Sequence, residues 1–257
     1  MKKLLVIVMM FSLMGLLSVF AQEVKPGQTE VVDLGKGVML EMVLIPAGKF
    51  MMGSLETEKN RGEDELQHEV TIIKPFYIGK TEVTQEQWQT VMGNSPSEIK
   101  GVRLPVTNVS WGDCQDFIKI LNGKTKGGFR LPTEAEWEYA CRGGKSTAYY
   151  FGNEVTPKDV NYAASNLGKT VPVASKKANV FGLHEMHGNV WEWCEDWYGV
   201  YFEGPVKDPK GAENGSRRCA RGGSFFDAES DARSSNRYAV PPSTRNGYIG
   251  LRLVRSN

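Results

Sequence analysis

Few residues of this sequence have the types and spacing that side-chain catalysis requires. His184 and His187 stand three residues apart beside a tryptophan-rich segment, whereas His68 lies in a charged stretch. A metal pair at His184 and His187 would need a third ligand nearby, and none is evident, so ordinary polar packing is favoured. Ser224 follows two glycines but lacks a Gly-x-Ser-x-Gly turn and a histidine placed to activate it, which is typical of a turn serine.

Three acidic residues, Asp227, Glu229 and Asp231, offer a carboxylate pair of the glycosidase type. Such a pair needs a defined separation in the fold, which sequence spacing does not give, and exposed acidic loop residues are far more common. These residues lie between Phe225 and Tyr248, in a mixture of large aromatic, small and acidic types without helical or strand period. That mixture predicts an exposed loop.

The cysteines form neither a Cys-x-x-Cys pair nor a cluster with histidine at zinc-ligand spacing. The four positions are Cys114, Cys141, Cys194 and Cys219. Export would permit disulfides, but Cys114 and Cys141 fall on apolar faces of predicted helices, where a buried free thiol is an ordinary outcome. We therefore expect buried thiols.

The start of the sequence predicts export. A basic Met1-Lys2-Lys3 precedes an apolar run from Leu4 to Phe20 and a small residue, Ala21, so residues 1–21 are predicted to be a signal peptide that is cleaved rather than kept as a membrane anchor. The expected location is the periplasm, the outer surface or the medium, with no membrane span after cleavage. A net charge of +1 with both signs scattered predicts no nucleic-acid partner.

The elements that would position these residues have readable boundaries. We expect a loose polar leader at 22–36, a strand at 38–45, and one large domain at 37–257. Capping boxes begin three predicted helices at Thr84, Ser110 and Thr133. From Lys145 onward the helical period is lost, and turn-forming residues separate short apolar pieces. That half of the chain is the one most suited to binding.

Ordered motifs across most of the chain resemble the formylglycine-generating enzyme, or sulfatase-modifying factor, family. They lie at 42–53, 82–84, 105–111, 130–138 and 182–193, and they include Arg-Leu-Pro-Thr-Glu-Ala-Glu-Trp-Glu and Gly-Asn-Val-Trp-Glu-Trp. The resemblance implies a single loop-rich α+β domain with a C-type lectin-like fold. It does not by itself imply the chemistry of the enzyme.

In the oxidising enzymes of that family, two cysteines that follow a Gly-Gly-Ser motif hold copper and attack the substrate thiol. The matching positions in this chain, counted from Ser224, are Asp227 and about Ala232. Neither residue is a thiolate ligand for copper(I) or a partner for a mixed disulfide. We therefore expect no copper and no formylglycine-generating activity, which leaves that enzyme as the second hypothesis.

The resemblance also implies a calcium site beside the tryptophan motif. Calcium takes hard oxygen ligands from carboxylates and backbone carbonyls. The matching residues are Glu185, Gly188, Val190 and Glu192. The alternative is that Glu192 only satisfies buried backbone donors. A second calcium site of the family, which would begin at Asn161, lacks its later aspartate here and is expected to be lost. Burial is expected for Trp191, Trp193 and Trp197.

A narrower resemblance is to the variable proteins of diversity-generating retroelements, of the treponemal type. In that group an adenine-directed reverse transcriptase rewrites asparagine codons, and most residue types in the 225–248 segment are reachable in this way. The residues expected to form variable binding loops are Phe226, Asp227, Ala228, Glu229, Ser230, Asp231, Tyr238, Ala239, Val240, Asn246, Gly247 and Tyr248. Aromatic residues among short polar ones suit a binding surface.

The preferred hypothesis is therefore an exported, non-catalytic protein that binds a protein or cell-surface ligand. A structural envelope protein is the third hypothesis. The alternative to a variable surface is that Phe225 and Phe226 are core residues and the rest of the segment is a solvated loop. Phe225 itself is expected to lie in the core.

Overall fold

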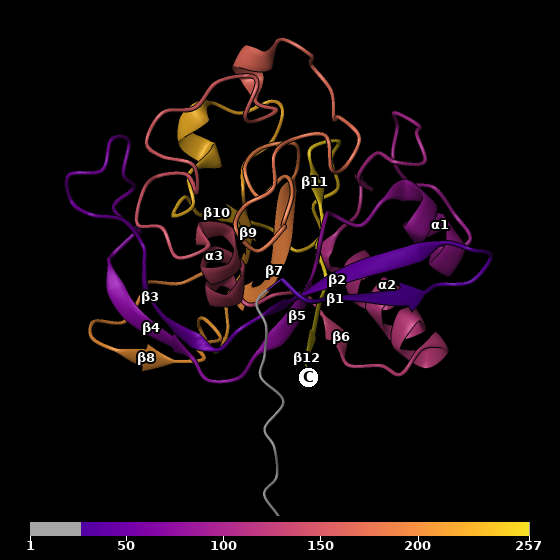
Figure 1. The fold of residues 1–257 in the computed structure, drawn as a ribbon, viewed down its shortest axis with the longest axis horizontal. Coiled ribbons are helices and arrows are strands. Elements are labelled where there is room, and N and C mark those ends of the chain that lie inside the picture. Colours follow the sequence, from indigo (N-terminus) through magenta and orange to yellow (C-terminus); the bar gives the residue numbers. More distant parts are fainter. Residues whose placement is uncertain (1–26, 257) are drawn as a thin grey trace, which may run out of the picture.

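Twelve short strands and three α-helices are the regular elements of residues 27–256, the part of the chain that the computed structural model describes (Figure 1). The predicted signal peptide at 1–21 lies outside this part. The strands form sheets of five, four and three strands. This mixture of helices, small sheets and long connections confirms the predicted loop-rich α+β class.

The five-stranded sheet has the order β1-β2-β5-β12-β6 and is antiparallel throughout. Its strands are β1 (Thr29–Asp33), β2 (Met39–Ile45), β5 (Phe76–Gly79), β6 (Phe129–Arg130) and β12 (Val254–Ser256). The strand predicted at 38–45 is β2. Both ends of the described chain thus lie in one sheet.

The expectation of a loose leader at 22–36 is wrong for β1. This strand pairs with β2 from Thr29 opposite Val43 to Asp33 opposite Met39. Its side chains are only partly covered, as expected for an edge strand. The leader composition gave little sign of the strand, because only Val32 packs against the interior and backbone pairing to β2 supplies the other contacts.

Two smaller sheets complete the framework. The four-stranded sheet has the order β10-β9-β7-β11 and the three-stranded sheet has the order β3-β4-β8. Their strands are β3 (Gly48–Met52), β4 (His68–Ile72), β7 (Trp191–Trp197), β8 (Val206–Lys207), β9 (Arg218–Arg221), β10 (Tyr238–Val240) and β11 (Ile249–Gly250). β7 and β11 are parallel, as are β4 and β8, and the other pairs are antiparallel.

All three predicted helices form, and each begins at the predicted capping box. They are α1 (Gln85–Met92), α2 (Trp111–Lys124) and α3 (Glu134–Arg142), with N-caps at Thr84, Ser110 and Thr133. In each box the N-cap side chain accepts from the third helical amide while that residue's side chain accepts from the N-cap amide. A reciprocal pair of this kind satisfies two amides that the helix leaves free.

Two apolar clusters share the interior. One packs α1 and α2 against the five-stranded sheet and includes Trp88, Phe117 and Trp193. The other surrounds α3 and includes Trp137, Cys194 and Cys219. β7 contributes to both because its alternate side chains face opposite sides. No helix within residues 27–256 is both long and apolar enough to span a membrane.

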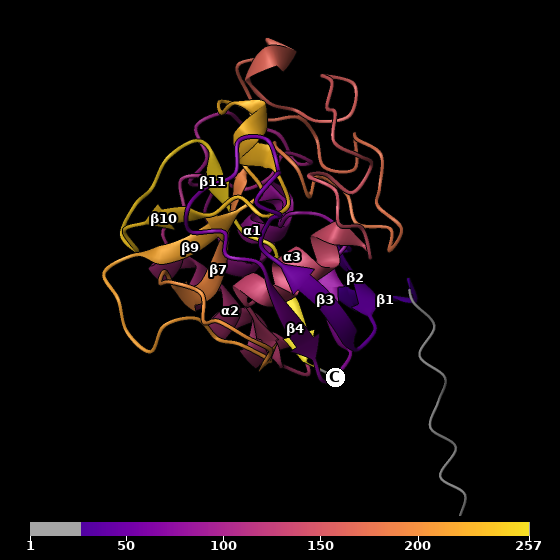
Figure 2. The same cartoon turned by 90° about the vertical axis from the view of Figure 1, so that its left-hand side faces the viewer.

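The irregular half of the chain gathers on one side of this framework. Between α3 and β7 the only helix is a short 3-10 turn, η1 (Ala163–Ser165), and a second, η2 (Glu229–Ala232), follows β9. Figures 1 and 2 both show these connections at the top of the molecule, away from the end of the described chain. The 225–248 segment and the 145–190 segment therefore form one face together.

Candidate binding surface

The 225–248 segment starts at a turn that requires glycine. Gly222 and Gly223 have φ angles of +100° and +74°. A Cβ on Gly223 would lie 2.9 Å from the backbone nitrogen of Ala232, and one on Gly222 would lie 3.1 Å from the ring of Trp137. The Gly222 carbonyl also accepts a 2.7 Å hydrogen bond from the amide of Gly188. The motif that contains Gly188 and the Gly222-Gly223 turn thus meet at the base of the 225–248 segment.

Two arginines hold the middle of the segment to the domain. Arg233 donates to both carboxylate oxygens of Glu65, at 2.6 and 2.8 Å, and to Glu58 at 2.7 Å. Arg237 donates to both oxygens of Glu134, at 2.7 and 2.9 Å. Both arginine side chains are buried. The backbone between them is therefore fixed by paired charges from the β3–β4 connection and from α3.

The same charges extend under the segment through β9. Arg221 is fully buried, donates to Glu134 and Glu138, and also donates to the carbonyls of Ser234 and Ser235. Burial alone would raise the pKa of Glu134, but the two neighbouring arginine charges lower it to about 2. Each of these carboxylates faces a guanidinium, so the network has a structural role, and the Nε of Arg221 is left buried without a hydrogen-bond partner.

Three aromatic side chains of the segment form one group, in which Phe226 and Tyr238 are exposed and Tyr248 is half-buried against the first apolar cluster. Phe226 is 71% exposed and its ring stacks on Tyr248, with centroids 6.2 Å apart and planes at 16°. Tyr238 is 36% exposed and packs 4.9 Å from the buried ring of Trp191. Partial burial, and then the proximity of Tyr248, raise the pKa of Tyr238. We call Phe226, Tyr238 and Tyr248 the aromatic shelf.

Asp227 lies beneath the shelf and makes structural contacts. Its carboxylate accepts a 2.8 Å hydrogen bond from the indole of Trp191 and another from the hydroxyl of Ser224. Its backbone carbonyl accepts from the amide of Ala163 at 2.9 Å, which ties the segment to η1. The turn-serine interpretation of Ser224 is confirmed, because its hydroxyl is engaged by this carboxylate.

The acidic part of the segment forms η2, which follows Phe226 after Asp227 and Ala228. Ala228 and Glu229 are exposed, whereas Ser230 and Asp231 are half-buried. Burial, followed by the charge of Asp227, raises the pKa of Asp231. The predicted residues therefore divide into an aromatic group and an acidic group.

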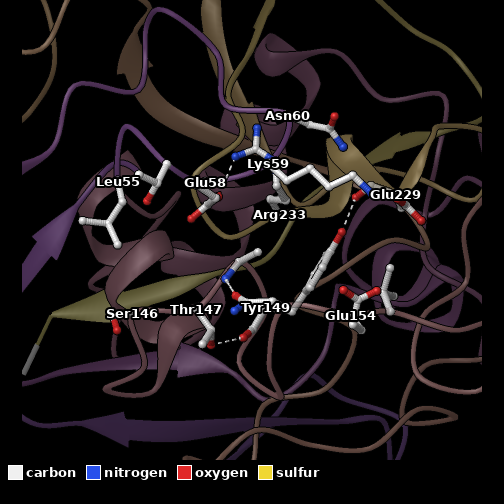
Figure 3. A pocket seen from close by; sticks show the side chains of 14 residues that line it. Leu55, Glu58, Lys59, Asn60, Ser146, Thr147, Tyr149, Glu154, Glu229 and Arg233 are labelled. Atoms are coloured by element: carbon white, nitrogen blue, oxygen red, sulfur yellow. Dashed lines mark hydrogen bonds and ion pairs between the residues drawn. The ribbon is translucent and has the colours of Figure 1, made fainter.

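A polar cavity of about 380 Å³ opens beside η2 (Figure 3). Glu229 and Arg233 come from the 225–248 segment, and the other lining residues lie at 55–60 and 146–155. The hydroxyl of Tyr149 donates to the Glu229 carbonyl at 2.8 Å, and the ammonium of Lys59 lies 3.8 Å from the Glu229 carboxylate. The sequence did not indicate these lining residues, because the 55–60 stretch has only the composition of a charged surface loop.

Several residues predicted for the binding surface lie elsewhere. The expectation for Val240 is wrong: it is 1% exposed and packs in the first apolar cluster, because β10 turns that side chain inward. Ala239 is half-buried, as are Asn246 and Gly247. Asn246 accepts a 2.8 Å hydrogen bond from the amide of Asn108. Phe225, expected in the core, is half-buried and belongs to neither large cluster.

The carboxylates predicted to bind calcium already have partners. Glu192 accepts from the guanidinium of Arg252 at 2.8–3.1 Å and from the indole of Trp137 at 2.7 Å. Glu185 accepts three backbone amide bonds of 2.8–2.9 Å, from Ala174, Ser175 and Lys176. The two carboxylates therefore face donors and a fixed positive charge, which is a poor fit for a cation.

The other two predicted calcium ligands, Gly188 and Val190, offer only backbone carbonyls. Within residues 27–256 no group of three or more histidine, cysteine or acidic side chains is arranged to hold a metal ion. Glu82 lies nearby, and burial, followed by the charge of Glu185, raises its pKa well above the usual range. Calcium binding at this point stays a prediction, and this arrangement argues against it.

His184 and His187 show ordinary polar packing, as predicted, with His187 buried and His184 half-buried. The ring of His187 is buried, accepts from the amide of Tyr150 at 3.2 Å and lies 2.7 Å from the carbonyl of Ala232. Burial lowers the pKa of His187 to about 4, so the ring is neutral. His184 contacts the carbonyl of Lys176 at 2.8 Å. The two histidine rings thus contact the carbonyls of different residues.

The cysteines, Trp191 and Trp193 are buried as expected, whereas Trp197 is less buried than expected. All four cysteines are buried, and each is an unbonded thiol in this structure. Burial raises the pKa of Cys141 to about 12, which removes the thiolate form near neutral pH. Trp191 and Trp193 are buried, and Trp197 is half-buried with the guanidinium of Arg218 3.5 Å above its ring.

The fold and this surface define a class of protein: a C-type lectin-like domain of the formylglycine-generating type, with a loop surface above a buried charged frame. The chain belongs to the sulfatase-modifying factor enzyme 1-like domain family, whose model matches residues 28–257. The formylglycine-generating enzyme of Streptomyces coelicolor is 30% identical over 285 residues, which cover 82% of this chain and 88% of that one.

Two solved structures are similar over almost their whole length. Treponema denticola variable protein 1 has a TM-score of 0.81 at 29% identity, covering 89% of this chain and 99% of that one. PvdO from Pseudomonas aeruginosa has a TM-score of 0.81 at 31% identity, covering 91% and 99%. These matches confirm the predicted fold and the resemblance to a variable protein.

Other curated relatives are longer than this chain. The serine/threonine-protein kinase pkn1 of Chlamydia caviae is 31% identical over 265 residues, and the chain spans 39% of its length. Relatives of this chain thus include proteins named as a kinase and as a formylglycine-generating enzyme. Because one fold serves different functions, the function of this chain has to be argued from its own surface.

Proposed function

We propose that this protein is an exported, non-catalytic binding protein that contacts a protein or cell-surface ligand through the aromatic shelf. The observation that carries the proposal is the exposure of Phe226 and Tyr238 on a segment whose backbone is held by buried arginines. Exposed aromatic side chains give large contact area at little rotamer cost. A preorganised backbone lowers the entropy cost of binding.

Two observations support a non-catalytic role over a formylglycine-generating one. The positions that match the copper-binding cysteines of the enzyme carry Asp227 and Ala232. Asp227 is engaged by the Trp191 indole, and Ala232 is buried against His187. Neither position presents a thiolate to a copper ion or to a substrate thiol.

The resemblance to Treponema denticola variable protein 1 supports diversification of the shelf as part of this proposal. Phe226 and Tyr238 lie on the surface, where substitutions have little effect on folding, whereas Tyr248 is half-buried and packs against the first apolar cluster. A near-copy of the codons for 225–248, with adenines at the shelf positions and beside a reverse-transcriptase gene, is the expected genomic observation. Absence of this repeat would remove diversification from the proposal and leave binding.

The enzymatic alternative has a direct test. The purified protein is incubated with a Cys-x-Pro-x-Arg peptide, copper and oxygen, and the peptide mass is followed. We expect no formylglycine, whereas its appearance at a rate proportional to protein concentration would overturn the non-catalytic proposal. The active Streptomyces coelicolor homologue serves as the positive control.

A test of binding uses the shelf itself. A display library that varies Phe226, Tyr238 and Tyr248 is selected against a panel of purified proteins, and a matched library varies three exposed residues away from the shelf, Lys74, Val102 and Lys145. The shelf library should yield binders whose affinity is lost when the three positions are replaced by serine. Equal yield from both libraries would contradict a specialised surface.

A further inference from the structure

Two cysteines lie opposite each other on neighbouring strands of the central sheet. The antiparallel register of β7 and β9 pairs Glu192 with Arg221 and Trp193 with Ala220. The next residues in this register are Cys194 on β7 and Cys219 on β9. Opposed residues of antiparallel strands have Cα atoms about 4.5 or 5.5 Å apart. Both separations lie inside the usual range for a disulfide.

The two side chains also face the same side of the sheet. Alternation along a strand places Cys194 on the face of Glu192, and Cys219 on the face of Arg221. Both cysteines pack in the apolar cluster around α3, whereas Trp193 and Ala220, which lie between these positions, pack in the other cluster. The register and the packing therefore agree that the two thiols share one face.

The remaining cysteines have other surroundings. Cys114 packs in the cluster of α1 and α2, and the thiol of Cys141 contacts Met186, His187 and Ser234. Their positions on separate helices match the buried free thiols expected from the sequence. Only the β7–β9 pair has the strand register that favours a bond.

The folded protein protects this pair. Both side chains are fully buried, the thiol of Cys219 lies 3.4 Å from Glu134, and that of Cys194 lies 3.9 Å from the carbonyl of Glu192. Burial raises the pKa of each thiol well above its ordinary value. Because the thiolate is the reactive form, oxidation has to take place while the chain folds.

We propose that Cys194 and Cys219 are a modification site, at which a cross-strand disulfide forms as the exported chain folds in an oxidising compartment. The oxidant is the disulfide of a thiol–disulfide oxidoreductase. One cysteine thiolate attacks that disulfide to give a mixed disulfide, and the second displaces the enzyme thiol. One S–S bond forms and one breaks, and two electrons and two protons pass from the cysteine pair to the enzyme, which becomes a dithiol.

The bond would close the chain between residues 194 and 219 at the base of the surface. β9 leads directly from Cys219 into the Gly222-Gly223 turn, and β10 pairs with β9 on its other side. A covalent link between β7 and β9 therefore holds the strands from which the 225–248 segment departs. This inference rests on the export part of the proposed function, and not on ligand binding.

The test counts thiols in the full-length chain purified after export. The protein is denatured in the presence of N-ethylmaleimide without reductant, and its mass is measured. We expect two alkylated cysteines, which rise to four after reduction, and a linked peptide pair that contains Cys194 and Cys219. Four alkylated cysteines without reduction, or a link between any other pair, would overturn the proposal.

Variants keep the test specific. Cys194→Ala should leave three alkylated cysteines without reductant, whereas the matched core variant Cys114→Ala should leave one. In the unmodified protein, reductant should lower the melting temperature by roughly 5–10 °C. The Cys114→Ala variant should show the same shift, and the double variant Cys194→Ala/Cys219→Ala none. A shift that persists in the double variant contradicts the assignment. Because these readouts need no ligand, their failure leaves the binding proposal intact.

Discussion

The inner and outer parts of the 225–248 segment differ in how their side chains are held. In the inner part, Arg233 and Arg237 reach carboxylates from the β3–β4 connection and from α3, and both are buried. In the outer part, Phe226 and Tyr238 contact mainly other aromatic rings and face solvent. One short, irregular segment therefore combines a backbone held by buried ion pairs with aromatic side chains that face solvent.

The largest effect on stability is expected when a buried charge of the inner part is removed. Arg233→Met removes the partner of Glu65 and Glu58 and leaves two carboxylates without a guanidinium. We expect the free energy of unfolding to fall by about 3–5 kcal/mol, because breaking a buried pair leaves an uncompensated charge. Denaturant unfolding measures the change. Arg245→Met, at an exposed pair with Asp113, is the control and should unfold like the parent.

If the lost charge causes the destabilisation by Arg233→Met, that destabilisation should be smaller at low pH. Burial alone would raise the pKa of Glu65, but the Arg233 hydrogen bond and its companions lower it to about 2, against 4.5 in the unfolded chain. The stability from this carboxylate is therefore present above about pH 4.5 and is lost as the pH falls toward 2. The difference in stability between parent and Arg233→Met should shrink over that range. A difference independent of pH would indicate lost packing instead.

Serine substitutions at Val240 and Phe226 should differ in their cost in stability, because one side chain lies in the core and the other at the surface. Val240→Ser places a hydroxyl in the apolar cluster and should cost about 2–4 kcal/mol. Phe226→Ser, at a residue that is 71% exposed, should change stability by about 0.5 kcal/mol or less. Thermal unfolding of both variants measures the contrast. Equal losses would show that the shelf is part of the core and would remove the basis of the binding proposal.

The smallest expected effect concerns calcium. Because Glu192 is held by Arg252 and Trp137, a chelator should leave the melting temperature of the protein unchanged. Differential scanning calorimetry with calcium and with EDTA checks this expectation. A stabilisation by calcium that disappears in Glu192→Gln would show that the ion displaces the arginine, since a ligand of the native state raises stability by mass action.

The sequence was sufficient for the parts of the fold that are encoded locally. The boxes at Thr84, Ser110 and Thr133 each set a helix start, because the N-cap side chain and the residue three positions later are all that the motif needs. The strand at 39–45 followed from its apolar run. The strand at 29–33 did not, because its apolar stretch is only Val31-Val32 and the pairing to β2 that completes it is not visible in the sequence.

The sequence by itself determined the family fold, the helix starts, the Gly222-Gly223 turn and the loop character of 225–248. Only the tertiary structure decided which of those loop residues face outward: Val240 turns into the core, Asp227 accepts the Trp191 indole, and Phe226 and Tyr248 stack at the surface. It also placed Arg233 against Glu58 and Glu65, more than 160 residues away in the chain. The physical reason is that an irregular segment has no repeating geometry, so each side-chain direction depends on the distant partners that its backbone and charges meet.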